Sequence, residues 1–297
     1  MGERRASVAS SPGFPARVRR FLGADKTALA AWLVLGFFFV LALAGPYIAP
    51  RDPVESNYRE DGSLVRLEPP SREFWLGTTN VGQDVLSQTI AGARIPIEVG
   101  LVSAFFVVLI GTNVGLIAGY FGRYIDEILM RITDVAYGIP FIPFAIVLIS
   151  VTGVGTTNIM LAITLLLWRT SARVIRAQVL TLKQRPFVLA AKLSGASDFR
   201  ILYRYIAPHV LPLTLLYMAF GVAWGILAEV SLGFVGLGDP ESISWGQMLF
   251  YAFRSGAIRF AWWWTLPPGI AIVLTVASFY LIGRSFEGIA DPRLRER

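Results

Sequence analysis

The chain has 297 residues, of which 55% are hydrophobic and only 16% are charged. Soluble domains carry about 25% charged residues, and the mean hydropathy here is positive, at +0.58, so the composition excludes an ordinary soluble protein. The absence of cysteine excludes disulfides and thiolate metal sites. The formal charge of +7 comes from basic residues that flank apolar runs, which is a membrane-orientation pattern and not a nucleic-acid-binding face.

Six apolar runs predict membrane-spanning helices. A spanning helix needs about 20 mostly apolar residues, because the hydrocarbon layer is about 30 Å thick and each helical residue rises about 1.5 Å. The third and fourth runs are short and are separated by a Gly/Thr turn, which predicts a helical hairpin. The fold class is therefore an all-α membrane protein with six transmembrane helices, over Ala28–Ile48, Val99–Tyr120, Ile139–Val154, Asn158–Val174, Val210–Phe234 and Trp262–Ile282.

Positive charge collects in two segments, which predicts that both are cytoplasmic. One precedes the first run, which is too long for the apolar part of a signal peptide and is expected to be retained. The other lies between the fourth and fifth runs. We therefore expect both termini in the cytoplasm, as tails at 1–27 and 285–297. Between them we expect the first helix with an extracytoplasmic loop at 28–97, and then a core of five helices at 98–284. This core contains a cytoplasmic loop at 184–212.

Residues needed for several kinds of catalysis are missing. None of the three lysines follows a glycine, so the phosphate loop G-x-x-x-x-G-K-[ST] is absent and ATP hydrolysis by that route is excluded. The single histidine, His209, excludes an H-E-x-x-H metal site and any catalytic arrangement that needs a second histidine. We interpret His209 as an interfacial or hydrogen-bonded side chain near the start of the fifth span, and not as a proton relay.

Small residues recur on one face of the second run. Gly111, Gly115 and Gly119 stand four residues apart, and such a face lets another helix approach closely, because association in lipid depends on packing. Two acidic residues fall in the runs. Glu98 begins the second run and is expected at the interface, whereas Glu229 lies inside the fifth and is either a structural partner of another helix or part of a substrate pathway.

The sixth run opens with three tryptophans at 262–264, which predict an aromatic anchor at the headgroup level. Pro267 and Pro268 follow, and they predict a kink or backbone carbonyl groups freed from the helix.

The segment Gln184–Pro212 is the most informative part of the chain. It reads QRPFVLAAKLSGASDFRILYRYIAPHVLP, which predicts a short helix with a small-residue face, an interruption at Gly195, and a second helix capped by Ser197 or Asp198 that leads into the fifth span. Such a helix is either a plain interfacial helix or a rigid lever that docks into a partner.

The alanines and glycine of this segment resemble the EAA loop of bacterial and archaeal ABC importer permeases, whose pattern is E-A-A, three residues, G, and a spacer ending in L-P. Ala190, Ala191, Gly195 and Pro212 match it, whereas Leu189 stands in place of the family's leading Glu. Further matching segments follow in order: LGTTNVGQDVLSQTIAGARI at 76–95, ARVIRAQVL at 172–180, LGFVGLGDPESISWGQML at 232–249, WWWTLPPGIAIVLTVASFYLIG at 262–283 and a closing DPRLR.

From Phe74 to Arg295 the chain resembles the C-type permease of the dipeptide/oligopeptide/nickel importer family. It departs from that family at Thr79 and Gln83, where Asp and Arg are usual. The resemblance implies the type I ABC importer permease fold and a subunit that forms half of the passage for peptides, with ATPase-coupling residues Leu189, Ala190, Ala191, Leu193, Ser194, Gly195, Ala196, Ser197 and Asp198.

The same resemblance implies the partners: a B-type permease, two cytoplasmic ATPases, an extracytoplasmic substrate-binding protein, and membrane lipid. It also implies that the chain is not an enzyme and holds no cofactor or metal, since ATP and Mg are bound by the ATPases. Oligosaccharides or nickel are alternative substrates in this family. Two alternatives belong to other functional classes. A stand-alone secondary carrier would require ionisable pairs inside the membrane and usually internal repeats, and neither is seen in the sequence. An intramembrane enzyme would require more catalytic residues than the sequence holds.

Overall fold

A computed structural model describes residues 26–290, and the side chains as far as residue 285. Throughout this part of the chain the ordered elements are helices. Five of them are long and apolar enough to cross a bilayer, which confirms five of the predicted spans. They are α2 (Lys26–Ile48), α4 (Arg94–Phe121), α7 (Thr156–Leu182), α10 (Ala207–Phe234) and α12 (Trp262–Ala290).

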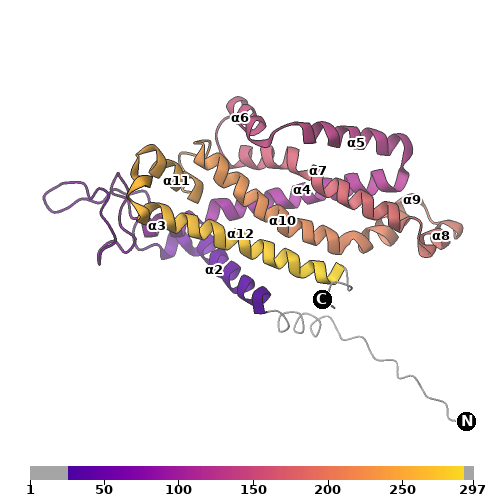
Figure 1. Ribbon diagram of the computed structural model, residues 1–297, viewed down its shortest axis with the longest axis horizontal. Helices are drawn as coiled ribbons and strands as arrows, with labels where there is room; N and C mark the ends of the chain where they lie inside the picture. Colours follow the sequence, from indigo (N-terminus) through magenta and orange to yellow (C-terminus); the bar gives the residue numbers. More distant parts are fainter. Residues whose placement is uncertain (1–25, 291–297) are drawn as a thin grey trace, which may run out of the picture.

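Shorter helices close the two ends of this bundle (Figure 1). One end carries α3 (Val85–Ala91), α11 (Trp245–Arg254) and a 3₁₀ turn at Ala257–Arg259. The opposite end carries α8 (Pro186–Leu193) and α9 (Asp198–Arg200), followed by the π-helical segment Ile201–Ile206 that runs into α10. The start of α2 and the end of α12 point toward the same end as α8.

Helices α4 and α7 pack along a glycine seam. A Cβ at Gly111 would lie 2.6 Å from the Trp168 carbonyl oxygen, and one at Gly115 would lie 2.6 Å from the Ala172 carbonyl oxygen. One at Gly119 would lie 2.8 Å from the Val179 Cβ. The backbones therefore touch at three successive turns. Because both partners advance together along their sequences, the two helices run parallel.

The third predicted span, Ile139–Val154, is wrong as a single helix. Its apolar part forms α6 (Phe141–Thr152), which has only 12 residues and is about 18 Å long. The preceding residues form the amphipathic helix α5 (Arg123–Gly138), and the two are bent by 89°. Since α4 and α7 run parallel, the chain must return across the layer between them, and α5 makes that return (Figure 1). The crossing is thus a broken span, which brings the total to six.

Helix α10 packs against α4 through small residues. A Cβ at Gly225 would lie 2.9 Å from the Cα of Gly100, and one at Gly221 would lie 3.3 Å from the Cβ of Ala104. The sequence numbers of these partners run in opposite directions, so α10 is antiparallel to α4. Helix α12 packs on α10 in turn, where Gly283 meets the Phe220 ring.

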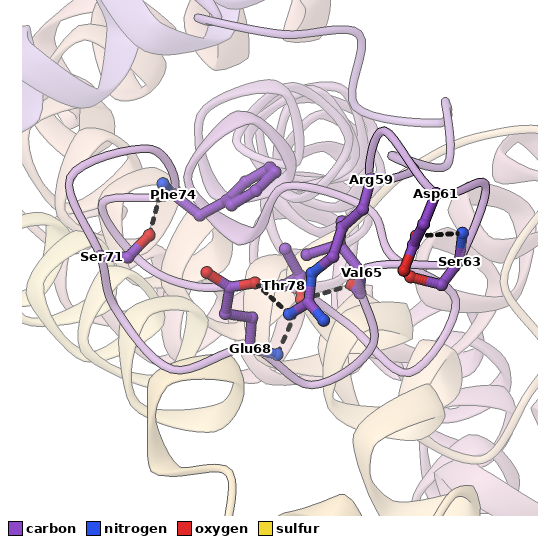
Figure 2. A network of polar contacts seen from close by, with 8 residues as sticks. All are labelled: Arg59, Asp61, Ser63, Val65, Glu68, Ser71, Phe74 and Thr78. Atoms are coloured by element: carbon purple, nitrogen blue, oxygen red, sulfur yellow. Dashed lines mark hydrogen bonds and ion pairs between the residues drawn. The ribbon is translucent and has the colours of Figure 1, made fainter.

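The loop between α2 and α3 folds into a hydrogen-bonded cap at the α11 end of the bundle (Figures 1 and 2). The Thr78 hydroxyl donates to the Val65 carbonyl at 2.8 Å and accepts from the Glu68 amide at 2.9 Å, and Glu68 pairs with Arg59 at 3.1 Å. Hydrogen bonds from Ser63 lower the pKa of the exposed Asp61 carboxyl. The cap is therefore a defined structure and not only a solvated linker.

Two side chains that depart from the usual family pattern hold this cap together. The Thr79 hydroxyl is buried and accepts from the Gln83 amide at 3.1 Å. The Gln83 side-chain amide donates to the Val54 carbonyl at 2.8 Å and accepts from Gln88 at 2.9 Å. At these two positions, therefore, neutral side chains stabilise the fold of the loop by hydrogen bonds.

The three tryptophans of the predicted anchor have different surroundings. Trp262 is exposed, but Trp263 donates to the Thr78 carbonyl of the cap at 3.3 Å and Trp264 is 2% exposed in the core. Successive residues on a helix point in different directions, so three adjacent rings cannot share one interfacial position. Pro267 and Pro268 lie inside α12, which runs on through them as one helix.

Candidate functional site

The segment joining α7 to α10 forms a helix, a glycine break and a second helix, as the sequence predicts. Pro186 occupies the first turn of α8, where its missing N–H costs nothing. The helix ends at Leu193, and Gly195 follows its C-cap with a φ of +76° that favours glycine, while the Ala196 amide closes the end by donating to the Ala191 carbonyl at 3.1 Å. Ser197 is extended and starts α9 by its backbone alone, without a side-chain capping bond.

Helix α8 has one face buried in the bundle and one face open. Val188 and Ala191 are buried in a cluster with residues of α4, α7 and α10. On the outer face Leu189 is 51% exposed and Leu193 is 89% exposed, and Phe199 of α9 is 73% exposed. Covering three such side chains would contribute about 1.5–3 kcal/mol each. The open face is therefore a strong apolar contact surface, which we call the docking knob (Leu189, Leu193 and Phe199).

The other predicted coupling residues surround the docking knob. Ala191 faces the bundle and Ala196 is half-buried, whereas the remaining members are exposed: Ala190, Ser194, Gly195, Ser197 and Asp198. Leu189, at the position of the family's Glu, adds apolar area to the knob in place of a charge.

Polar bonds tie the docking knob to the spanning helices. The Tyr120 hydroxyl at the end of α4 donates to the Asp198 carboxylate at 2.6 Å, and the Lys183 ammonium donates to the Gly119 carbonyl at 2.9 Å. The Phe187 ring stacks on the His209 ring at 4.7 Å between centroids. His209 also bonds the Tyr205 carbonyl, which fits a structural histidine. The contacts of Asp198 and Phe187 thus join the two short helices to α4 and α10, whereas the Lys183 bond joins α7 to α4 beside them.

We expect Tyr120→Phe to loosen this connection. Removing the hydroxyl leaves the Asp198 carboxylate without its Tyr120 donor, and because this carboxylate is exposed to water the lost hydrogen bond should cost about 0.5–1.5 kcal/mol. Coupled transport by the assembled protein should fall roughly three- to tenfold, with little change in the amount of protein in the membrane. Tyr47→Phe is the matched control, because the Tyr47 side chain is 89% exposed at the other end of the bundle. Equal transport by both variants would contradict the role of Tyr120.

Glu229 lies between α10 and α11. It is 1% exposed, and its Oε2 atom has no hydrogen-bond partner among the described residues. The Ser244 hydroxyl at the start of α11 lies within hydrogen-bonding reach of the carboxyl group, and Gly246 packs against the Val230 backbone beside it. The side chain is thus enclosed within this chain and does not face an open passage.

Helix α5 carries charged residues that the sequence analysis passed over. Asp126 accepts two hydrogen bonds from Arg176 of α7, at 2.5 and 2.6 Å. Further along, Asp134 pairs with Arg173, whose guanidinium also lies 4.0 Å from the centre of the Tyr137 ring. Polar pairs therefore hold α5 against α7. The signal in the sequence was the matching set of arginines in the second half of α7.

Family models match both parts of the chain. Residues 111–296 match the binding-protein-dependent transport system inner membrane component, and residues 15–70 match the N-terminal TM domain of oligopeptide transport permease C.

Several curated relatives match most of the chain. It is 36% identical over 277 residues to the dipeptide transport system permease protein DppC of Bacillus subtilis (strain 168), which covers 93% of this chain and 85% of that protein. It is 34% identical to the glutathione transport system permease protein GsiD of Pectobacterium atrosepticum, covering 93% and 90%. It is 32% identical to the oligopeptide transport system permease protein OppC of B. subtilis, covering 92% and 87%.

A solved structure shares the fold. A chain of the MetNI methionine ABC transporter, in a crystal form described as inward facing, superposes with a TM-score of 0.54 over 68% of this chain and 94% of that one. The sequence identity is 20%, so this likeness concerns the fold alone. It agrees with the predicted type I permease architecture.

Proposed function

We propose, from the premise that this chain belongs to the binding-protein-dependent transport system inner membrane component family, that it forms one half of the passage through which an ABC importer moves peptides. Members of this family are multi-pass membrane permease subunits of ABC importers. Peptides are proposed as the substrate because DppC and OppC of B. subtilis are named for dipeptide and oligopeptide transport.

The single observation that carries the proposal is the docking knob. It exposes apolar side chains beyond the spans on two short helices, of which α9 is hydrogen-bonded to α4 and α8 packs against α10, and such a placement suits a part that receives force from a partner. ATP and Mg would bind to that partner, an ATPase, and this chain would hold no cofactor. Nucleotide binding supplies the difference in affinity between two states that such switching requires.

The complete importer would contain a B-type permease beside this chain, two cytoplasmic ATPases and an extracytoplasmic substrate-binding protein. We infer that the docking knob and both termini lie in the cytoplasm. The excess of Lys and Arg around 169–204 supports this orientation, as do the directions of α2 and α12, because the start of α2 and the end of α12 point toward the end of the bundle that carries α8 (Figure 1). The cap around Thr78 would then lie outside.

The test is reconstitution in proteoliposomes. The five-component complex, with its own substrate-binding protein, should accumulate labelled dipeptides or oligopeptides only when ATP is enclosed on the ATPase side, whereas this chain alone should transport none. Oligosaccharides and nickel are measured in parallel. Uptake of peptide by this chain without an ATPase would refute the proposal, and uptake of sugar or nickel in preference to peptide would refute the substrate.

A further inference from the structure

Helix α5 exposes a stripe of charge along one side. Arg123, Glu127 and Arg131 stand four residues apart, so they lie one above another on the helix, and all three are exposed. None of the ion pairs within residues 26–285 includes them. The pair of Asp134 with Arg173 extends the same side toward α6.

The stripe separates two other faces of α5. On one side of it the helix is buried or paired against α7, through Asp126, Thr133 and Ala136. On its other side lies an exposed apolar face, whose members are Tyr124, Ile128, Ile132 and Val135. The charges are therefore confined to a narrow strip between the packed face and the apolar face.

The charges of this strip make lipid chains an unfavourable surrounding for it. The helix returns across the layer between the parallel helices α4 and α7, and its charged part lies beside the second half of α7, where Arg173 and Arg176 are. A charged side chain facing lipid inside a bilayer costs about 2.5–3.5 kcal/mol or more. The apolar face can meet lipid or a neighbouring helix, but the strip must meet water or polar groups.

We propose that the stripe of Arg123, Glu127 and Arg131 lines the cytoplasmic half of the passage and contacts the substrate, Glu127 its cationic group and Arg131 its anionic group. This inference rests on the proposed function. The two opposite charges sit one helical turn apart, about 6 Å between their Cβ atoms, and a peptide with free ends carries an ammonium group and a carboxylate. The charge pattern therefore matches a zwitterionic substrate.

The absence of cysteine makes the environment of the stripe directly measurable. Single-cysteine variants Glu127→Cys and Arg131→Cys are compared with Ile128→Cys and Ile132→Cys from the apolar face, in the assembled complex with cysteine-free partners. A charged, water-soluble thiol reagent attacks only thiolates in water. We expect the stripe positions to react at least about tenfold faster than the apolar positions, and saturating substrate trapped in the passage should slow that reaction.

A second measurement tests substrate contact by charge. Arg131→Gln should raise the KM about tenfold for a peptide with a free carboxylate and leave it unchanged for the same peptide with an amidated end. Glu127→Gln should raise the KM about tenfold for a peptide with a free amino end and leave it unchanged for the same peptide with an acetylated amino end. Glu98→Gln is the matched control, because Glu98 loses the same charge at the start of α4, where it is paired only with Arg94.

The outcomes separate this inference from the proposed function. Slow labelling at positions 127 and 131 in a complex that still imports peptide would overturn the inference alone, since the stripe would then be buried against the second permease. Equal labelling at all four positions would also overturn it. Fast labelling with KM changes that ignore the peptide's end groups would overturn the substrate contact.

Discussion

Gly115→Leu should prevent this chain from accumulating as a folded permease. A Cβ at Gly115 would already lie 2.6 Å from the Ala172 carbonyl oxygen and 2.8 Å from the Ile175 Cβ, and both belong to the facing helix. Backbone cannot move aside as a flexible side chain can, so α4 and α7 would have to separate along the whole seam. We expect a loss of more than about 3 kcal/mol and at least a tenfold drop in monodisperse protein after detergent extraction.

The matched control for this change is Gly36→Leu. Gly36 lies in the middle of the spanning helix α2, and a Cβ there would meet nothing within 4 Å. This control adds the same side chain to a glycine in the same kind of helix, and it should extract normally. If the two variants behaved alike, the α4–α7 seam would not be what limits folding.

Leu193→Asp should abolish coupled transport while leaving the permease intact. Leu193 is 89% exposed on the docking knob, so the folded chain does not need it for packing. In the groove of a partner, however, the variant would bury a carboxylate that has no partner, and a buried charge left unpaired costs about 3–5 kcal/mol. We expect substrate uptake to fall at least about thirtyfold, measured in proteoliposomes with the complete importer.

Leu193→Met is the conservative control and should retain uptake, because methionine keeps the apolar contact. The ATPase activity adds a second readout. In the aspartate variant, substrate-loaded receptor should no longer stimulate ATP hydrolysis, and pull-down of the ATPases should weaken. Normal uptake by Leu193→Asp would remove the docking knob from the mechanism, whatever the state of the ATPases.

The long spans and the coupling loop could be predicted from the sequence because their signals are local. An apolar run sets the length of a spanning helix, and a proline at position 186 with a glycine at position 195 sets the ends of α8. The side chains that connect α8 to the bundle could not be predicted in the same way. Tyr120 and Asp198 are 78 residues apart, and only the fold brings their oxygen atoms to 2.6 Å.

Helix α5 escaped the sequence analysis for a physical reason. Its charges recur every third or fourth residue, so its mean hydropathy is low and no apolar run reveals it, although Asp126 and Asp134 find their arginine partners on α7. Apolar α6 gives the stronger signal, which predicts a span there alone. The chain must cross back between α4 and α7 because these two helices run parallel. Their parallel direction follows from contacts between glycines of α4 and residues of α7 that are distant in the sequence.

The segment Ile201–Ile206 joins the docking knob to α10 with π-helical bonding. Each turn of a π-helix holds more residues than an α-turn, and such stretches are costly and short. If the segment adopted α-helical bonding with one residue fewer in its turns, the docking knob would rotate by about 100° about the axis of α10 and shift along it by about 1.5 Å. The π-helical bonding of this segment therefore sets the direction in which the docking knob points relative to α10, and a variant that shortened the segment by one residue would turn the knob away from its contacts with Tyr120 and His209.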